Sequence, residues 1–503
     1  MRAPGLPALP QEGLFIAIPD DCEVKDIQII DKKEKELEGE YLVLPASKPV
    51  HEGEKEIYIR DTATYESDEP YPGKYVELLG TANVAGRRVA HILIYPAQYR
   101  PKSKKLSLLE SIDFNIIYKT RYEMCASPRK RTSRRLLIER MILDPERLNE
   151  TKWLGEEPKR KTSNKASSGL KDPTNDAEYL IITTDDLKDS FDELIKAQLS
   201  ARTVKLVTKT EIIQEFPNPK EDEAIKDFLS YAMDNWQGTP QWVVLGGDVD
   251  KIPTHIATSS DEQEIASDHF YADLRGDIIP EIVVSRIPIS DPEMMKTFCK
   301  NSVLYGKCER VGRANCLLTT CNAEPPKYEN CANEIAGIIG DHFNVIKRYD
   351  GQASKSDVID AVNKGVGIIN YRGHGAPTAW RAGNGLGNED VHKLDNGKNI
   401  PMVWSLACWN NDIDMDGECF GEAWIKNMKA ITFFGASRPS WTTENDSFNK
   451  YIFDGIVNQG LTKAGDIMNW AVTKLFSNLK NDCAIDNIRM YLLLGDPTAD
   501  LGE

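Results

Sequence analysis

The sequence predicts an α/β fold with a mainly parallel sheet flanked by helices, preceded by an all-β region. From Tyr179 onward, short apolar runs alternate with helical patterns, as in βαβ units. Before residue 120, by contrast, alternating apolar segments are punctuated by Pro and Gly, which is typical of antiparallel strands. A basic, polar stretch separates these two textures. The chain therefore divides into three parts.

Composition limits the classes of function. The 503 residues are 41% hydrophobic and 28% charged, which is ordinary for a soluble globular protein with a large core and more than one domain. The net charge of -16 argues against nucleic acid or an anionic membrane surface as a partner. No apolar run has the length of a transmembrane helix. Ten cysteines without paired C-x-x-C spacing predict neither a disulfide scaffold nor a zinc site.

The first predicted domain covers residues 1–125 and is rich in β-structure. Its strands are expected at Tyr41–Leu44, Glu56–Ile59 and Val89–Ile94, where apolar residues alternate. The first residues, Met1–Pro7, lack the apolar core of a signal peptide. Either the protein stays in the cell or a leader is missing from this sequence.

Residues 126–176 are predicted to be a basic, flexible linker. Five of the seven residues from Arg129 to Arg135 are basic, and Lys159–Gly169 is polar and of low complexity. The linker is either a solvated tether or a segment that a protease with a preference for Arg or Lys cuts, since nicking concentrates in such sequence. On the second reading, the candidate processing residues are Arg131, Arg135 and Arg160.

The third part, 177–503, carries the α/β pattern. A long helix is expected between Pro292 and Tyr305, and it divides the region into candidate subdomains 177–308 and 309–503. The predicted strands of the parallel sheet are Tyr179–Thr184, Lys205–Val207, Trp242–Leu245, Ile282–Val284, Cys316–Leu318, Val366–Ile369, Met402–Leu406 and Ile431–Phe434.

Two of these strands lead into loops that carry reactive side chains. The run Val366–Tyr371 breaks into Gly373-His374-Gly375, and Pro401–Ala407 leads to Cys408. Carboxyl ends of parallel strands share one edge of the sheet, so His374 and Cys408 can face each other as base and thiol nucleophile. The glycines leave the imidazole unshielded, and the Gly375 and Cys408 amides can form an oxyanion hole.

Further motifs accompany this pair. They are Trp242–Asp248 with Ile252-Pro253, Ser267–Leu274, Val283–Arg286, Asn370–Gly375 with Trp380, Leu406–Cys408 with Asn410, and Leu494–Pro497. As a set they are specific, and with them residues 179–500 resemble the gingipain-type cysteine peptidases, relatives of caspases and separases. The front of the chain resembles the propeptide of this family through Tyr71-Pro72-Gly73 and Tyr95–Tyr99. The whole chain is thus similar to a zymogen.

The resemblance implies a caspase-like fold and assigns roles to particular residues. His374 matches the catalytic histidine and Cys408 the nucleophile, and the Gly375 and Cys408 amides match the oxyanion donors. Glu324 best fits the carboxylate that orients the histidine. Trp441 matches an aromatic wall of the specificity pocket, and Glu329 is the candidate for the acidic residue that selects a basic side chain.

Two acidic segments raise the question of calcium, although no cofactor is required. Family members often carry an acidic repeat after Tyr-Ala-Asp-Leu, but here Arg275 interrupts it and leaves Asp273 and Asp277. The spacing of Asp412, Asp414 and Asp416 is that of the start of an EF-hand loop, although position twelve is not Glu. This loop is an acidic surface loop, a structural calcium site, or an attractor of cationic substrate.

The resulting hypothesis is a cysteine endopeptidase zymogen that cleaves proteins or peptides after Arg or Lys and processes itself in the basic linker. Its own propeptide would be an intramolecular inhibitor. The resemblance favours an extracellular or cell-envelope location, although no signal peptide or sorting domain is present in this sequence. Two alternatives remain open. One is an inactive gingipain-like binding protein, and the other is a thiol transpeptidase or amidase with the same dyad.

Overall fold

A computed structural model describes residues 3–19, 22–84, 87–120, 142–143, 169–307, 310–381, 385–479 and 481–502. The chain forms two compact units, Met1–Lys161 with Lys474–Asn481 (the β unit) and Thr162–Thr473 with Asp482–Glu503 (the α/β unit). The candidate processing residues Arg131, Arg135 and Arg160 lie outside the described residues, as does the predicted linker 126–176 except for 142–143 and 169–176. No described helix combines the length and the apolar character needed to cross a membrane.

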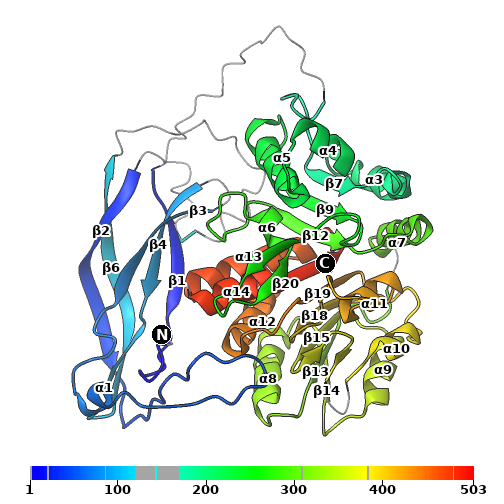
Figure 1. The fold of residues 1–503 in the computed structure, drawn as a ribbon. Coiled ribbons are helices and arrows are strands. Elements are labelled where there is room, and N and C mark those ends of the chain that lie inside the picture. Colours follow the sequence, from blue (N-terminus) through cyan, green and yellow to red (C-terminus); the bar gives the residue numbers. More distant parts are fainter. Residues whose placement is uncertain are drawn as a thin grey trace. The chain divides into compact units, whose positions relative to one another are not determined.

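The β unit contains two antiparallel sheets (Figure 1). One has the order β1 (Glu12–Ala17), β4 (Arg87–Ile94), β3 (Val76–Val84), and the other has the order β2 (Cys22–Glu36), β6 (Lys105–Thr120), β5 (Ala97–Arg100). A short helix, α1, covers Thr62–Glu66. Alternating side chains of β1 and β4, with Ile18 beyond the end of β1, place Ile16, Ile18, Ala90 and Ile92 in a shared core.

The predicted strand at Val89–Ile94 is present as β4, but those at Tyr41–Leu44 and Glu56–Ile59 are not strands. Both segments lack a ladder partner and make only isolated backbone hydrogen bonds, such as Ala8 N–H to Leu44 O at 2.9 Å. Alternation of apolar residues indicates an extended chain, but a strand also requires a neighbouring chain in register.

The α/β unit is built on one sheet of ten strands. Their order is β14 (Asn344–Tyr349), β13 (Asn315–Thr320), β15 (Ile368–Arg372), β18 (Met402–Leu406), β19 (Thr432–Ala436), β20 (Tyr491–Gly495), β12 (Val283–Ile287), β9 (Trp242–Gly246), β7 (Tyr179–Thr183), β8 (Val204–Thr208). All neighbours pair in parallel except β19 and β20. Strands from 177–308 form one end of this sheet and strands from 309–503 form the other.

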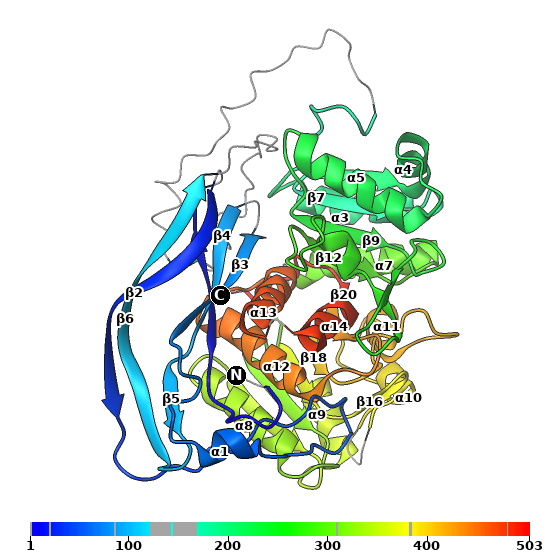
Figure 2. The same cartoon turned by 60° about the vertical axis from the view of Figure 1, so that its left-hand side comes forward.

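Helices flank the sheet (Figures 1 and 2). Their bounds are η2 Lys188–Phe191, α3 Asp192–Gln198, α4 Lys209–Glu215, α5 Glu221–Asn235, α6 His269–Ala272, α7 Pro292–Tyr305, α8 Lys327–Ile339, α9 Lys355–Lys364, α10 Asn388–His392, α11 Phe420–Lys426, α12 Thr442–Val457, α13 Ala464–Asn478 and α14 Asp482–Met490. Helix α7 has the bounds that the sequence predicts. It begins with Pro at its first position and an Asp291 cap that accepts from the Glu293 and Met294 amides.

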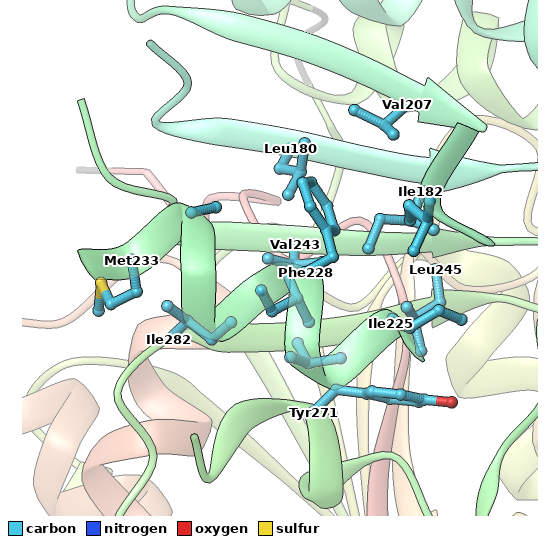
Figure 3. Packing of buried hydrophobic residues seen from close by; sticks show 14 of the residues in the cluster. Leu180, Ile182, Val207, Ile225, Phe228, Met233, Val243, Leu245, Tyr271 and Ile282 are labelled. Carbon is cyan, nitrogen blue, oxygen red and sulfur yellow. The ribbon is translucent and has the colours of Figure 1, made fainter. Parts of the chain in front are cut away.

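The core at the β7–β9 end of the sheet shows how these layers hold together (Figure 3). Helix α5 buries Ile225, Phe228 and Met233 against the strand residues Leu180, Ile182, Val207, Val243 and Leu245. Phe228 is completely buried and contacts the rings of Phe216 and Trp236 at centroid distances of 5.6 and 5.5 Å. The apolar stripe of α5 therefore attaches this end of the sheet to its helical layer.

We expect Phe228→Ala to lower the free energy of unfolding of the α/β unit by about 3–5 kcal/mol, because it removes a fully buried ring and leaves a cavity. Urea unfolding followed by tryptophan fluorescence measures this change. Leu199→Ala is the control, since this side chain is 55% exposed. A loss as small for Phe228→Ala as for Leu199→Ala would contradict the assigned packing.

Candidate active site

Four neighbouring strands deliver the candidate site to one edge of the sheet. In the order β13, β15, β18, β19 they run parallel, with Thr320 opposite Arg372 and Arg372 opposite Leu406. Their carboxyl ends therefore lie side by side, where chemistry gathers in open α/β sheets. Glu324 follows β13, His374 follows β15, Cys408 follows β18, and Trp441 follows β19.

The chain segments of His374 and Cys408 touch through Gly375. A Cβ atom on Gly375 would lie 2.0 Å from the carbonyl oxygen of Cys408, so no larger residue fits this approach. Asn410 fixes the same contact, because its Nδ2 donates to the carbonyls of Ala376 and Ala379 at 2.9 and 3.1 Å. The loop that carries the thiol is thus attached to the short hairpin that follows the histidine, β16 (Gly375–Ala376) and β17 (Ala379–Trp380).

His374 is held at its backbone and at its ring. Its carbonyl accepts from the Tyr371 hydroxyl at 2.7 Å and from the Arg381 amide at 2.9 Å. Its Nε2 lies 3.3 Å from Glu324 Oε1 and 3.3 Å from the Tyr328 hydroxyl. Because that hydroxyl donates to Glu324 Oε1 at 2.9 Å, both neighbours present acceptor lone pairs to Nε2. This arrangement favours the tautomer with the proton on Nε2. Nδ1 is then free of a proton and can accept one from a neighbouring group.

Cys408 is buried, and its sulfur lies against Ser440. The Ser440 amide donates to Sγ at 3.2 Å, and the Ser440 hydroxyl lies 3.6 Å from Sγ. The amide donor stabilises the thiolate relative to the thiol, while the Ser440 carbonyl, 4.0 Å from Sγ, can accept from the thiol. The next residue, Trp409, has a φ of 65°, a strained conformation for an aromatic residue. Its amide donates to the carbonyl of Arg438 at 3.3 Å, which helps to hold it there.

The acidic loop after Asn411 is closed by an arginine. Arg438 forms ion pairs with Asp412 at 2.7 Å and with Asp414 at 2.6 Å, while Asp416 is exposed. Burial, with the nearby charge of Asp414, raises the pKa of Asp412 to about 6. Within the described parts of the chain, no three or more His, Cys, Asp or Glu side chains are placed to hold a metal ion. In this structure Asp412 and Asp414 form an arginine-bridged carboxylate pair, and calcium binding by Asp412, Asp414 and Asp416 stays a prediction.

The candidate specificity residue Glu329 has surroundings of its own on α8, and its role stays a prediction. It lies on α8 beside Tyr349, the last residue of β14, where burial and the charge of Glu329 together raise the pKa of that tyrosine to about 12. Its neighbour Tyr328 is the residue of α8 that faces His374. Adjacent helix positions point about 100° apart, so Glu329 points in a different direction from Tyr328.

The surroundings of Trp441 contain a different carboxylate. Its indole Nε1 donates to Asp486 Oδ2 at 3.3 Å, and its amide donates to Asn487 Oδ1 at 2.9 Å. Both acceptors belong to α14. Asp486 is 1% exposed and also accepts from the amide and the hydroxyl of Ser260. Sequence patterns gave no signal for Asp486, because it reaches the site from the distant helix α14, and none for Ser440, because its contact with Sγ depends on how the loop after β19 packs.

The interrupted acidic repeat forms a closed turn. Asp273 accepts from the amides of Gly276, Asp277 and Ile278 at 2.7 to 3.1 Å, and Arg275 pairs with Asp234. Burial raises the pKa of the neighbouring Glu281 from 4.5 to about 8, assisted by the charges of Asp277 and Asp273. Backbone amides thus satisfy Asp273.

This raised pKa predicts a pH dependence of stability. Glu281 stabilises the fold fully below its unfolded pKa of 4.5, and this contribution is lost as pH rises through about 8. We therefore expect Glu281→Gln to gain thermal stability relative to the unaltered protein between pH 5 and pH 9. Differential scanning calorimetry measures the difference in melting temperature between the variant and the unaltered protein, with the exposed Glu389→Gln as control. A difference that is the same at every pH would refute the prediction.

Comparisons with known proteins are consistent with this geometry. The model of peptidase family C25 matches residues 172–502, and the model of the C25 propeptide matches residues 1–135. Gingipain R1 of Porphyromonas gingivalis is 24% identical over 444 residues, which are 84% of this chain and 42% of that protein. Lys-gingipain of the same organism is 24% identical over 216 residues, 41% of this chain and 12% of that protein. The chain thus spans less than half the length of these curated relatives.

Two solved structures share the fold. The crystal structure of the Arg-specific cysteine proteinase gingipain R matches with a TM-score of 0.57 and 20% identity, covering 66% of this chain and 80% of that chain. The complex of the pro- and mature domains of Porphyromonas gingivalis RgpB matches with a TM-score of 0.57 and 19% identity, covering 65% and 81%. The predicted fold class and the predicted family resemblance are confirmed.

Proposed function

The chain belongs to peptidase family C25, and from this premise we propose that it is the zymogen of a cysteine endopeptidase with Cys408 as nucleophile and His374 as base. The observation that carries the proposal is the contact between the two strand ends. Gly375, beside the histidine, lies directly against the carbonyl of Cys408, so the two chain segments that carry the base and the thiol are in contact.

The proposed reaction gives each of these groups one role. Nδ1 of His374 takes the thiol proton as Sγ of Cys408 attacks the scissile carbonyl, and the Gly375 and Cys408 amides receive the oxyanion. His374 returns the proton to the leaving amine as the peptide bond breaks, which leaves a thioester. Water, deprotonated by the same imidazole, then hydrolyses the thioester and restores the thiol. Glu324 keeps the Nε2 proton in place throughout.

Cleavage after Arg or Lys is the proposed specificity. Three observations support it. The linker contains Arg131, Arg135 and Arg160 as sites for self-processing. The relatives include proteins named Gingipain R1 and Lys-gingipain. The carboxylate of Asp486 lies beside Trp441, the candidate wall of the specificity pocket, and supplies negative charge there.

The N-terminal region is proposed to act as the inhibitor of its own peptidase until the linker is cut. The match of residues 1–135 to the C25 propeptide supports this role. The solved complex of the pro- and mature domains of RgpB is similar to this chain in fold. That complex supports retention of the propeptide after cleavage.

Self-processing is tested by incubating the purified full chain beside its Cys408→Ala form. We expect the unaltered chain to shorten, with new ends after Arg131, Arg135 or Arg160 that intact-mass spectrometry identifies, and the variant to stay whole. Cys483→Ala is the matched control, because this buried thiol lies on α14 and is 8% exposed, against 6% for Cys408. The proposal fails if Cys408→Ala is cut as fast as the unaltered chain, or if neither is cut.

Specificity is tested with peptides that differ only in the residue before the scissile bond. We expect kcat/KM for Arg or Lys to exceed that for Leu or Asp by on the order of 100-fold or more, because a buried carboxylate without a cationic partner costs several kcal/mol. Liquid chromatography of the products locates each cut. Faster cleavage after Leu or Asp would exclude the proposed specificity while leaving the endopeptidase activity intact.

A further inference from the structure

A tyrosine on α8 contacts both side chains that prepare the thiol. Tyr328 donates to Glu324 Oε1 at 2.9 Å, and its hydroxyl oxygen lies 3.3 Å from Nε2 of His374. Its ring meets the imidazole edge to face, with centroids 5.6 Å apart and an angle of 83°. We propose that Tyr328 is a positioning residue that holds Glu324 and the Nε2 proton of His374 in the geometry that the Cys408 thiol requires. This inference rests on the proposed function.

The position of Tyr328 is itself fixed by packing. The residue is 1% exposed, and the guanidinium of Arg372 lies 4.9 Å from the centre of its ring. Arg372 is immobilised by Asp446 at 2.8 Å and by the carbonyl of Thr442 at 3.0 Å. A cation over an aromatic face is attractive, and here the cation cannot move away. The hydroxyl therefore projects to one fixed point between Glu324 and His374.

Both oxygens of Glu324 are thereby occupied. Oε1 receives the Tyr328 hydroxyl, and Oε2 receives Lys327 Nζ at 3.0 Å. A carboxylate that is 31% exposed would otherwise rotate freely, since water can replace each partner. The adjacent residues Lys327 and Tyr328 hold it from the start of one helix.

The hydroxyl has a chemical role that a phenyl ring cannot replace. The hydroxyl donates its hydrogen bond to Glu324, so a lone pair on its oxygen is left to accept one from Nε2–H of His374. That lone pair stabilises the imidazolium that forms when Nδ1 takes the thiol proton. Charged and titratable groups near the imidazole include Glu324 and Tyr328, which lie at Nε2, and Lys327, which pairs with Glu324. Arg372 lies over the Tyr328 ring and pairs with Asp446. Cys408 is the thiol that the proposed reaction pairs with the imidazole.

Tyr328→Phe tests the proposal, because it keeps the ring over Arg372 and removes only the hydroxyl. We expect kcat of the self-processed protein to fall about 10- to 100-fold with KM unchanged, because a hydrogen bond to a charged group is lost and no substrate contact is altered. The pH range over which kcat/KM is high should become narrower at both its acidic and its alkaline limit. Alkylation of Cys408 by iodoacetamide at pH 7 should slow in parallel, since less thiolate is present.

Tyr349→Phe is the matched control. It also removes the hydroxyl of a buried tyrosine, one that bonds Asn333 of the same helix at 3.1 Å, away from the imidazole. We expect its kcat, pH profile and alkylation rate to equal those of the unaltered protein. Thermal unfolding of both variants shows how much of any effect is loss of fold.

A double substitution separates a positioning role from a purely structural one. If Tyr328 acts through Glu324 and His374, Glu324→Gln with Tyr328→Phe should lose less than the product of the two single losses. Multiplying losses, or an unchanged pH profile and alkylation rate in Tyr328→Phe, would overturn the inference. If the unaltered protein itself cleaves no peptide and Cys408 resists iodoacetamide, the proposed function fails instead.

Discussion

A single buried arginine organises the candidate site. Arg372, the last residue of β15, is fully buried, and its guanidinium bonds Asp446, Thr442 and the carbonyl of Leu406 while lying over Tyr328. A buried cation without partners costs several kcal/mol, so the partner elements must all be in place when β15 is in place. The ends of β15 and β18, the start of α12 and the start of α8 are thereby fixed together, and these segments carry His374, Cys408, Trp441 and Glu324.

The same physical solution recurs in the other half of the sheet. Arg286 in β12 is also fully buried, forms a bidentate pair with Asp268, and donates to the carbonyls of Gly247 and Ile252. Planar, multiply donating guanidinium groups suit this task, because they satisfy several loop carbonyls at once without freedom to rearrange. Each arginine turns the loops at a strand end into a rigid rim.

The rigid loops at this edge of the sheet hold one residue, Trp409, in a strained backbone conformation. Trp409, immediately after Cys408, keeps its positive φ because its backbone amide donates to the carbonyl of Arg438. The guanidinium of Arg438 also lies 5.6 Å from the centre of the Trp409 ring. Arg438 is in turn held by Asp412 and Asp414. Asp412 and Asp414 thus help to support the loop that carries the candidate nucleophile. A strained residue at a reactive position persists only where its surroundings determine it fully.

The sequence alone determined the strands of the α/β unit and the placement of His374 and Cys408 after strand ends at one edge of the sheet, because fully buried parallel strands are continuous apolar runs and their ends share an edge. Tertiary structure alone decided what surrounds that pair. Tyr328 is 46 residues from His374, and Arg438 is 26 residues from Asp412, so their contacts depend on how crossovers place distant segments. The phase of α8 turns Tyr328 toward His374, and Arg438, from the loop after β19, pairs with Asp412 and Asp414. Local pattern fixes which residues can be buried; packing decides which of them meet.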